Sequence, residues 1–66
     1  MRYVDSDLNL EMWISEEKTY GGHEWAVIQW GIMGDKEFEV GGLEPTFAQA
    51  DEKAYVAFYD RRDELK

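Results

Sequence analysis

Few residues of this chain could carry out acid–base or nucleophilic chemistry. His23 is the only histidine, and it follows a Gly-Gly turn. General acid–base catalysis needs a titrating side chain held beside a partner in a cleft, and a turn does not provide one. The carboxylate pairs Glu16–Glu17 and Asp51–Glu52 are of the common solvated kind, and no glycine-rich segment carries the Lys-Ser/Thr of a phosphate-binding loop. The sequence therefore predicts that the protein is not an enzyme.

Metal binding is the second chemistry to consider. The chain has no cysteine and a single histidine, which excludes thiolate sites and leaves a zinc site short of its usual ligands. Asp5, Asp7 and Asn9 begin like a calcium-binding loop, but Leu10 stands where that loop needs glycine. The alternating apolar residues that follow fit a strand better. We therefore expect neither a metal nor a cofactor.

The strongest signal in the composition is an excess of negative charge. The 66 residues include 15 Asp and Glu against 7 Lys and Arg, a net charge of −8, together with three Trp, four Tyr and three Phe. The aromatic content argues against disorder, while the charge repels nucleic acids and anionic membranes and favours basic surfaces. No signal peptide or membrane-spanning segment is recognised. We expect a single cytoplasmic domain over residues 1–66, a monomer and not a dimer, which binds a basic protein.

Three segments have the composition and period-two alternation of strands. They cover residues 8–15, 25–32 and 37–41. Residues 2–5 form either a short edge strand or a lead-in to the first strand. The last two strands join in a hairpin with two possible registers, because a two-residue loop pairs Phe38 with Gly31 and a three-residue loop pairs it with Ile32. Burial favours the second register, which gathers the apolar residues of both strands on one face.

A helix over residues 46–64 is predicted after Pro45 ends the third strand. Thr46 and Gln49 form a capping-box pattern at its start. Its core-facing stripe contains Phe47, Ala50, Ala54, Ala57, Phe58 and Leu65. The sequence therefore predicts an α+β fold in which a three-stranded antiparallel sheet packs on one C-terminal helix in two layers. One helix covers one face of such a sheet, so the other face meets water or a partner.

Acidic side chains are expected on both exposed surfaces of this fold. With Phe38 and Val40 turned to the core, Glu37 and Glu39 point outwards, about 6.6 Å apart, or about twice the phosphate step along one DNA strand. On the helix, the outward-facing acids have no Lys or Arg four residues away to offset them. These helix residues are Glu52, Asp60 and Asp63.

Large aromatic side chains on the uncovered sheet face would act as apolar anchors. The second strand is expected to turn Ala26, Ile28, Trp30 and Ile32 towards the core, which leaves Trp25 outside with Trp13. The predicted partner-binding residues are Asp35, Glu37, Glu39, Glu52, Asp60, Asp63, Trp13 and Trp25.

In size, absence of cysteine, acidity and compact α+β outline, the chain resembles the small acidic inhibitors that phages and mobile elements encode against host defences, chiefly the anti-CRISPR proteins that act as DNA mimics. The resemblance implies competition with target DNA for the basic channel of a CRISPR surveillance complex, with a Cas effector subunit as partner. Two alternatives remain. One is an assembly module that uses the uncovered sheet face. The other is an inhibitor of another basic host enzyme, such as RNA polymerase.

Residues 24–60 also resemble, in strand–strand–helix order, the DNA-binding domains of the AP2 and integrase arm-binding kind. Those domains read DNA with Arg and Lys on the sheet. Here the outward positions of the third strand are Glu37 and Glu39, which would repel a phosphate backbone. Direct binding of nucleic acid is therefore not expected.

Overall fold

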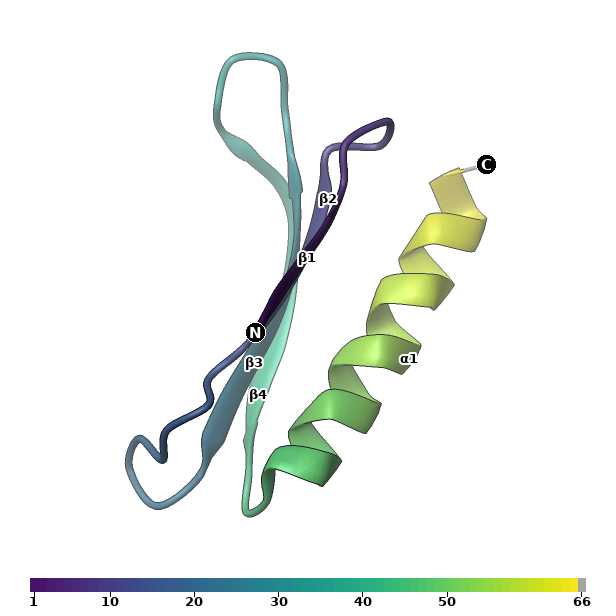
Figure 1. The fold of residues 1–66 in the computed structure, drawn as a ribbon. Helices are drawn as coiled ribbons and strands as arrows, with labels where there is room; N and C mark the ends of the chain where they lie inside the picture. Colours follow the sequence, from purple (N-terminus) through teal and green to yellow (C-terminus); the bar gives the residue numbers. More distant parts are fainter. Residues whose placement is uncertain (66) are drawn as a thin grey trace.

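The computed structural model describes residues 1–65, which form a four-stranded antiparallel meander followed by one helix (Figure 1). The elements are β1 (Arg2–Asp5), β2 (Leu10–Ile14), β3 (His23–Trp30), β4 (Lys36–Glu44) and α1 (Phe47–Leu65). The strands lie in the order β1-β2-β3-β4. The predicted antiparallel sheet with one C-terminal helix is confirmed, and the predicted number of strands is wrong. Residues 2–5 are a true strand, since Tyr3 pairs with Met12 along the edge of β2.

The core lies between α1 and one face of the sheet. Its buried residues are Leu10, Met12, Ile14, Trp25, Val27, Ala50, Ala54 and Phe58. The two alanines allow the helix to approach the strands closely, and Phe58 fills the space beside them. The helix begins where the capping box predicts, because the Gln49 backbone N–H donates to Thr46 Oγ1 at 3.2 Å. Within residues 1–65, no helix is both long enough and apolar enough to cross a membrane.

The face that β3 turns to the core is the opposite of the predicted one. Phe38 pairs with Gln29 instead of Ile32, a shift by an odd number of residues, which exchanges the inner and outer side chains of β3. Trp25 and Val27 are therefore buried. The indole of Trp25 lies over Gly42, where an added Cβ would come within 2.9 Å of Nε1. Burying this large ring against a glycine contributes more than burying Ala26 would.

A longer connection between β3 and β4 makes this register possible. The paired strands end at Trp30 and resume at Lys36, with a register irregularity after Gln29. The Gly31 backbone N–H donates to the Asp35 carbonyl at 2.7 Å, which closes a loop wider than either predicted one. Ile32 therefore lies in the loop and not in a strand. In Figure 1 this hairpin extends beyond the rest of the sheet.

Candidate functional site

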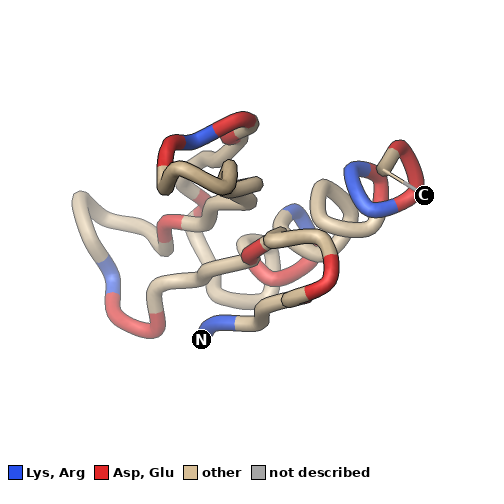
Figure 2. The backbone as a smooth tube through the Cα atoms, turned by 90° about the horizontal axis from the view of Figure 1, so that it is seen from above, with Lys and Arg blue, Asp and Glu red and all other residues tan. Residues whose placement is uncertain are grey.

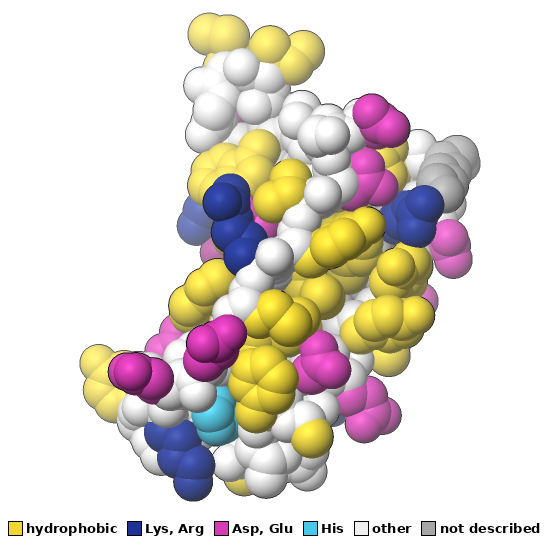
Figure 3. Space-filling model, in the orientation of Figure 1, with side chains coloured by type: hydrophobic (Ala, Val, Ile, Leu, Met, Phe, Trp, Pro, Cys, Tyr) yellow, Lys and Arg dark blue, Asp and Glu magenta, His cyan; other side chains and the backbone are white. Residues whose placement is uncertain are grey.

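The end of the β3–β4 hairpin combines exposed apolar side chains with carboxylates. Ile32 is 98% exposed and Met33 is 91% exposed, and hydrophobic side chains cap this end of the molecule in Figure 3. The carboxylates of Asp35 and Glu37 both approach Gly31, since a Cβ placed there would lie 2.8 Å from Asp35 Oδ1 and 2.8 Å from Glu37 Oε1. We refer to Ile32, Met33, Asp35 and Glu37 as the hairpin tip.

Lys36 lies between these two residues in the sequence, but its ammonium group contacts neither of their carboxylates. Its Nζ lies 3.1 Å from Glu39 Oε2 and 5.9 Å from the centre of the Trp30 ring. Within residues 1–65, no Lys or Arg forms an ion pair with Asp35 or Glu37. The hairpin tip therefore carries negative charge that the described part of the domain does not neutralise.

The outer face of the sheet, which is turned away from α1, has a mixed apolar and acidic surface. The residues whose alternation and pairing place them there include Val4, Glu11, Trp13, Glu24, Ala26, Ile28, Trp30, Glu39 and Leu43. Trp13 is 39% exposed on this face. The prediction that Trp25 lies beside it is wrong, because the observed register turns Trp25 to the core and leaves it 9% exposed. The outer face gains Trp30 in its place.

The acids of the helix form a separate group. Glu52, Asp60 and Asp63 are exposed and lie on the side of α1 opposite its buried residues, at helical spacing. The hairpin acids and the helix acids therefore lie on different elements of the two-layer fold, and Figure 2 shows red segments near the C-terminal end of the chain and others well away from it. The structure brings Asp35, Glu37 and Glu39 close together along the hairpin, but it does not join them with the helix acids in one continuous surface.

Glu11 occupies the middle of the outer face and is held by two donors. Trp30 Nε1 donates to Glu11 Oε1 at 2.9 Å, and Arg2 Nε donates to Oε2 in an ion pair. Partial burial alone would raise the pKa of Glu11, but the hydrogen bonds from Trp30 and Arg2, with the charge of Arg2, hold the pKa below its ordinary value. This carboxylate is a structural link between β1, β2 and β3.

We predict that Glu11→Gln lowers the free energy of unfolding at pH 7 by about 1 kcal/mol. Because the folded-state pKa is depressed, the carboxylate stabilises the fold above about pH 4.5, and this contribution is lost as the pH falls through the folded pKa. Urea unfolding of both proteins between pH 7 and pH 3 measures the difference, which should shrink in acid. Glu17→Gln, at an exposed loop position, is the control. A difference independent of pH would contradict the assignment.

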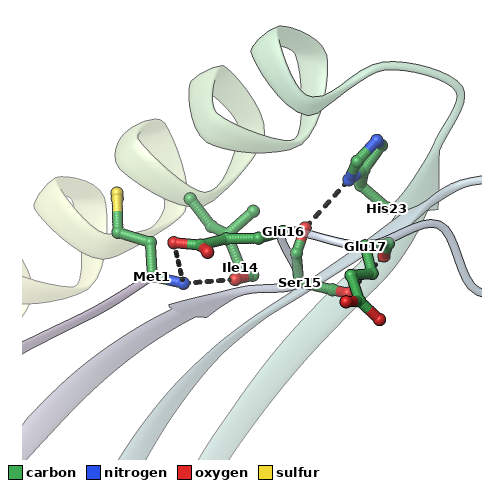
Figure 4. Close-up of polar contacts among 6 residues, drawn as sticks. All are labelled: Met1, Ile14, Ser15, Glu16, Glu17 and His23. Carbon is green, nitrogen blue, oxygen red and sulfur yellow. Dashed lines mark hydrogen bonds and ion pairs between the residues drawn. The ribbon is translucent and has the colours of Figure 1, made fainter.

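His23 lies at the end of the core and not in the predicted turn. It begins β3, is buried, and its Nδ1 donates to the Ser15 carbonyl at 2.9 Å (Figure 4). Its ring meets the Phe47 ring edge-on at 5.8 Å between centres. The sequence prediction missed this because the Gly-Gly turn ends one residue earlier, where Thr19 and Gly22 bridge. His23 therefore joins the end of β2, the start of β3 and the start of α1.

Asp5, Asp7 and Asn9, which resemble the start of a calcium-binding loop, lie at the end of β1 and in the turn that leads to β2. The Asp7 backbone N–H donates to Asp5 Oδ1 at 3.2 Å, and Arg62 lies 3.5 Å from Asp5 Oδ2. Within residues 1–65, no group of three or more His, Asp or Glu side chains is arranged to hold a metal ion. These oxygens therefore already have partners inside the protein.

An apolar pocket of about 270 Å³ lies between β1 and α1. It is lined by Met1, Arg2, Tyr3, Met12, Tyr55, Phe58 and Tyr59. It lies on the other side of the sheet from the outer face and at the opposite sheet edge from β4. None of the predicted partner-binding residues lines it, so it does not belong to the surface built by the hairpin.

Sequence reasoning missed the apolar part of the hairpin tip, because Ile32 fitted the alternation of β3 and was expected in the core. The glycines at positions 31 and 34 were the signal that a longer loop was possible.

Comparisons of this chain with protein-family models, with curated proteins and with solved structures found no match.

Proposed function

We propose that this protein is a non-enzymatic inhibitor that occupies a basic nucleic-acid-binding site on a partner protein, in the manner of the DNA-mimicking anti-CRISPR proteins. The observation that carries the proposal is the pair of carboxylates at the hairpin tip. Asp35 and Glu37 converge on Gly31, while Lys36 turns away to Glu39. A groove lined with Lys and Arg, built for a phosphate backbone, would supply the missing positive charge.

The surroundings of these carboxylates favour a binding role over a solvated surface. Like charges held close together repel one another, and a basic partner removes that repulsion. Ile32 and Met33 stand fully exposed beside them, an arrangement that contributes nothing to the folded domain by itself. Burial of these two side chains on a partner would add the apolar contact that protein interfaces need at their centre.

The other exposed residues that were predicted to bind a partner contribute to binding in two different ways. Glu39 and Trp13 lie on the outer face and extend the contact from the hairpin tip along the sheet. Glu52, Asp60 and Asp63 lie on the far side of α1 and contribute through the net charge of −8, which accelerates association with a basic partner. The partner expected from the resemblance is a Cas effector subunit, whose target DNA would compete for the same groove.

The test is retention of purified, assembled CRISPR surveillance complexes on the immobilised protein, with and without excess duplex target DNA. We expect a retained complex that DNA displaces and that dissociates as the salt concentration rises. RNA polymerase is the second basic target and is tested in the same way. If RNA polymerase alone is retained and DNA displaces it, the protein would be an inhibitor of transcription. Retention that DNA does not affect would contradict the proposal. Retention of further copies of the chain alone would favour the assembly module.

A further inference from the structure

Strand β4 is an open edge of the sheet. It is nine residues long and last in the strand order, so one side of its backbone has no neighbour within residues 1–65. Natural proteins usually protect such edges with short strands, lysines or prolines. The other edge strand, β1, has four residues, whereas β4 has a lysine only at its start and Pro45 only beyond its end.

The backbone groups that point to the open edge can be identified from the pairing. The Ser15 N–H donates to the Glu24 carbonyl at 2.9 Å, and the Trp30 N–H donates to the Asn9 carbonyl at 2.9 Å. Because bonding direction alternates in an antiparallel sheet, the even-numbered residues of β3 bond to β2 and the odd-numbered ones to β4. Through the pairs 29–38, 27–40 and 25–42, β3 engages Phe38, Val40 and Gly42. The intervening residues Glu39, Gly41 and Leu43 direct their N–H and C=O groups to the open edge.

The side chains of these open-edge residues lie on the outer face. Glu39 and Leu43 lie on either side of Gly41. Because Gly41 has no side chain, a space remains between the Glu39 and Leu43 side chains on the outer face. An added Cβ at Gly41 would lie 2.6 Å from the Trp25 carbonyl oxygen, so the position is closed to larger residues of this chain. A strand placed beside β4 could lay a large side chain across this glycine and an apolar one beside Leu43.

Charge decides which kind of strand fits. Glu37 and Glu39 stand at the same end of β4 and are exposed. A second copy of the chain would bring another net charge of −8 to this edge, which opposes self-pairing. Glu39 already contacts Lys36 Nζ at 3.1 Å through Oε2, but both side chains are about half exposed. Arg or Lys opposite Glu39 can therefore form a favourable cross-strand pair as well. The edge is therefore complementary to an extended basic segment, which is the kind of segment that lines a nucleic-acid groove.

We infer that an extended basic segment of the partner adds to the sheet as a fifth strand along β4, with a basic residue opposite Glu39 and a large side chain over Gly41. This inference rests on the proposed function and names its mode of recognition. Backbone hydrogen bonds would supply affinity, and the side chains opposite Glu39 and Gly41 would supply selectivity.

The probe is the peptide acetyl-Ile-Thr-Trp-Thr-Arg-Thr-Arg-amide, whose antiparallel register places Trp opposite Gly41 and the first Arg opposite Glu39. Amide hydrogen exchange of the full chain is followed by NMR with the peptide at about 1 mM. We expect exchange at Glu39, Gly41 and Leu43 to slow by at least about tenfold. The amides of Val40 and Gly42, already bonded to β3, should change little.

Two methylated peptides provide the matched control. N-methylation of the Trp removes an N–H that faces β4 and should weaken binding by at least about tenfold. N-methylation of the Thr after it removes an N–H that points away from β4 and should leave binding nearly unchanged. On the protein, Glu39→Lys should weaken peptide binding. Asp7→Lys makes the same change in net charge at an exposed position of the β1–β2 turn, at the other edge of the sheet, and should not.

The inference is overturned by the absence of binding at this concentration, by equal binding of the two methylated peptides, or by unchanged exchange at Glu39, Gly41 and Leu43. Protection of these amides in the chain alone would show pairing with a second copy and would also overturn it. If DNA still displaces a retained nucleic-acid-binding complex, the proposed function survives that failure. If the peptide protects the edge but no such complex is retained, the proposed function fails and the strand-addition site remains.

Discussion

Reversal of both Asp35 and Glu37 to Lys is expected to weaken binding to a basic nucleic-acid-binding partner by about 100-fold, or about 2.7 kcal/mol. Each substitution replaces an attraction with a repulsion at the point where the two carboxylates converge on Gly31. Both residues are exposed, so the free energy of unfolding should change by less than about 0.5 kcal/mol. Titration calorimetry with the partner and urea unfolding measure the two effects.

The matched control for this variant is reversal of Glu52 and Asp60 to Lys. It changes the net charge by the same amount on the opposite side of the domain, and we expect binding to weaken by less than about threefold. Equal weakening by the two double variants would mean that net charge, and not the hairpin tip, determines binding. The comparison therefore separates a local site from general electrostatic attraction.

Trp25→Ala should unfold most of the protein at 25 °C. The substitution removes a buried indole from the core and leaves a cavity, at a cost of about 3–5 kcal/mol. A domain of this size has a total stability of about the same magnitude. Circular dichroism should show loss of the helical signal, and urea unfolding should show no folded baseline.

Trp13→Ala is the control for that variant, because Trp13 lies on the outer face at 39% exposure. Its cost in stability should be less than about 1 kcal/mol, while binding to the partner should weaken. A folded Trp25→Ala protein with an unchanged unfolding midpoint would show that the register of β3 and β4 differs from the one described. Trp25 would then lie on the outer face, as the register with a three-residue hairpin loop predicts.

The helix and the antiparallel class of the sheet could be predicted from local signals. The Thr46–Gln49 capping box fixes the start of α1, and the spacing of Ala50, Ala54 and Phe58 identifies its buried side. These patterns are complete within a few consecutive residues. Helix geometry also places Glu52, Asp60 and Asp63 on the exposed side without reference to any other element.

The faces of β3 could not be predicted in the same way, because both of its faces are apolar. Ala26, Ile28 and Trp30 alternate with Trp25 and Val27, so either set could fill a core. The choice depends on contacts with β4, above all the space over Gly42 that accepts the Trp25 indole. The exposed position of Ile32 follows from that choice and not from its own sequence neighbours. The sequence therefore indicated that Asp35 and Glu37 are exposed, and it did not indicate the exposure of Ile32.

The most direct test of the central claim is photo-crosslinking from the hairpin tip. A photoreactive residue in place of Ile32, which is 98% exposed, would be activated in the presence of a retained surveillance complex, with the same residue in place of Val56 on α1 as control. We expect crosslinks from position 32 to basic residues of the nucleic-acid-binding groove, abolished by excess target DNA, and few from position 56. Crosslinks outside that groove, or equal crosslinking from both positions, would contradict the claim that the hairpin tip replaces the nucleic-acid backbone.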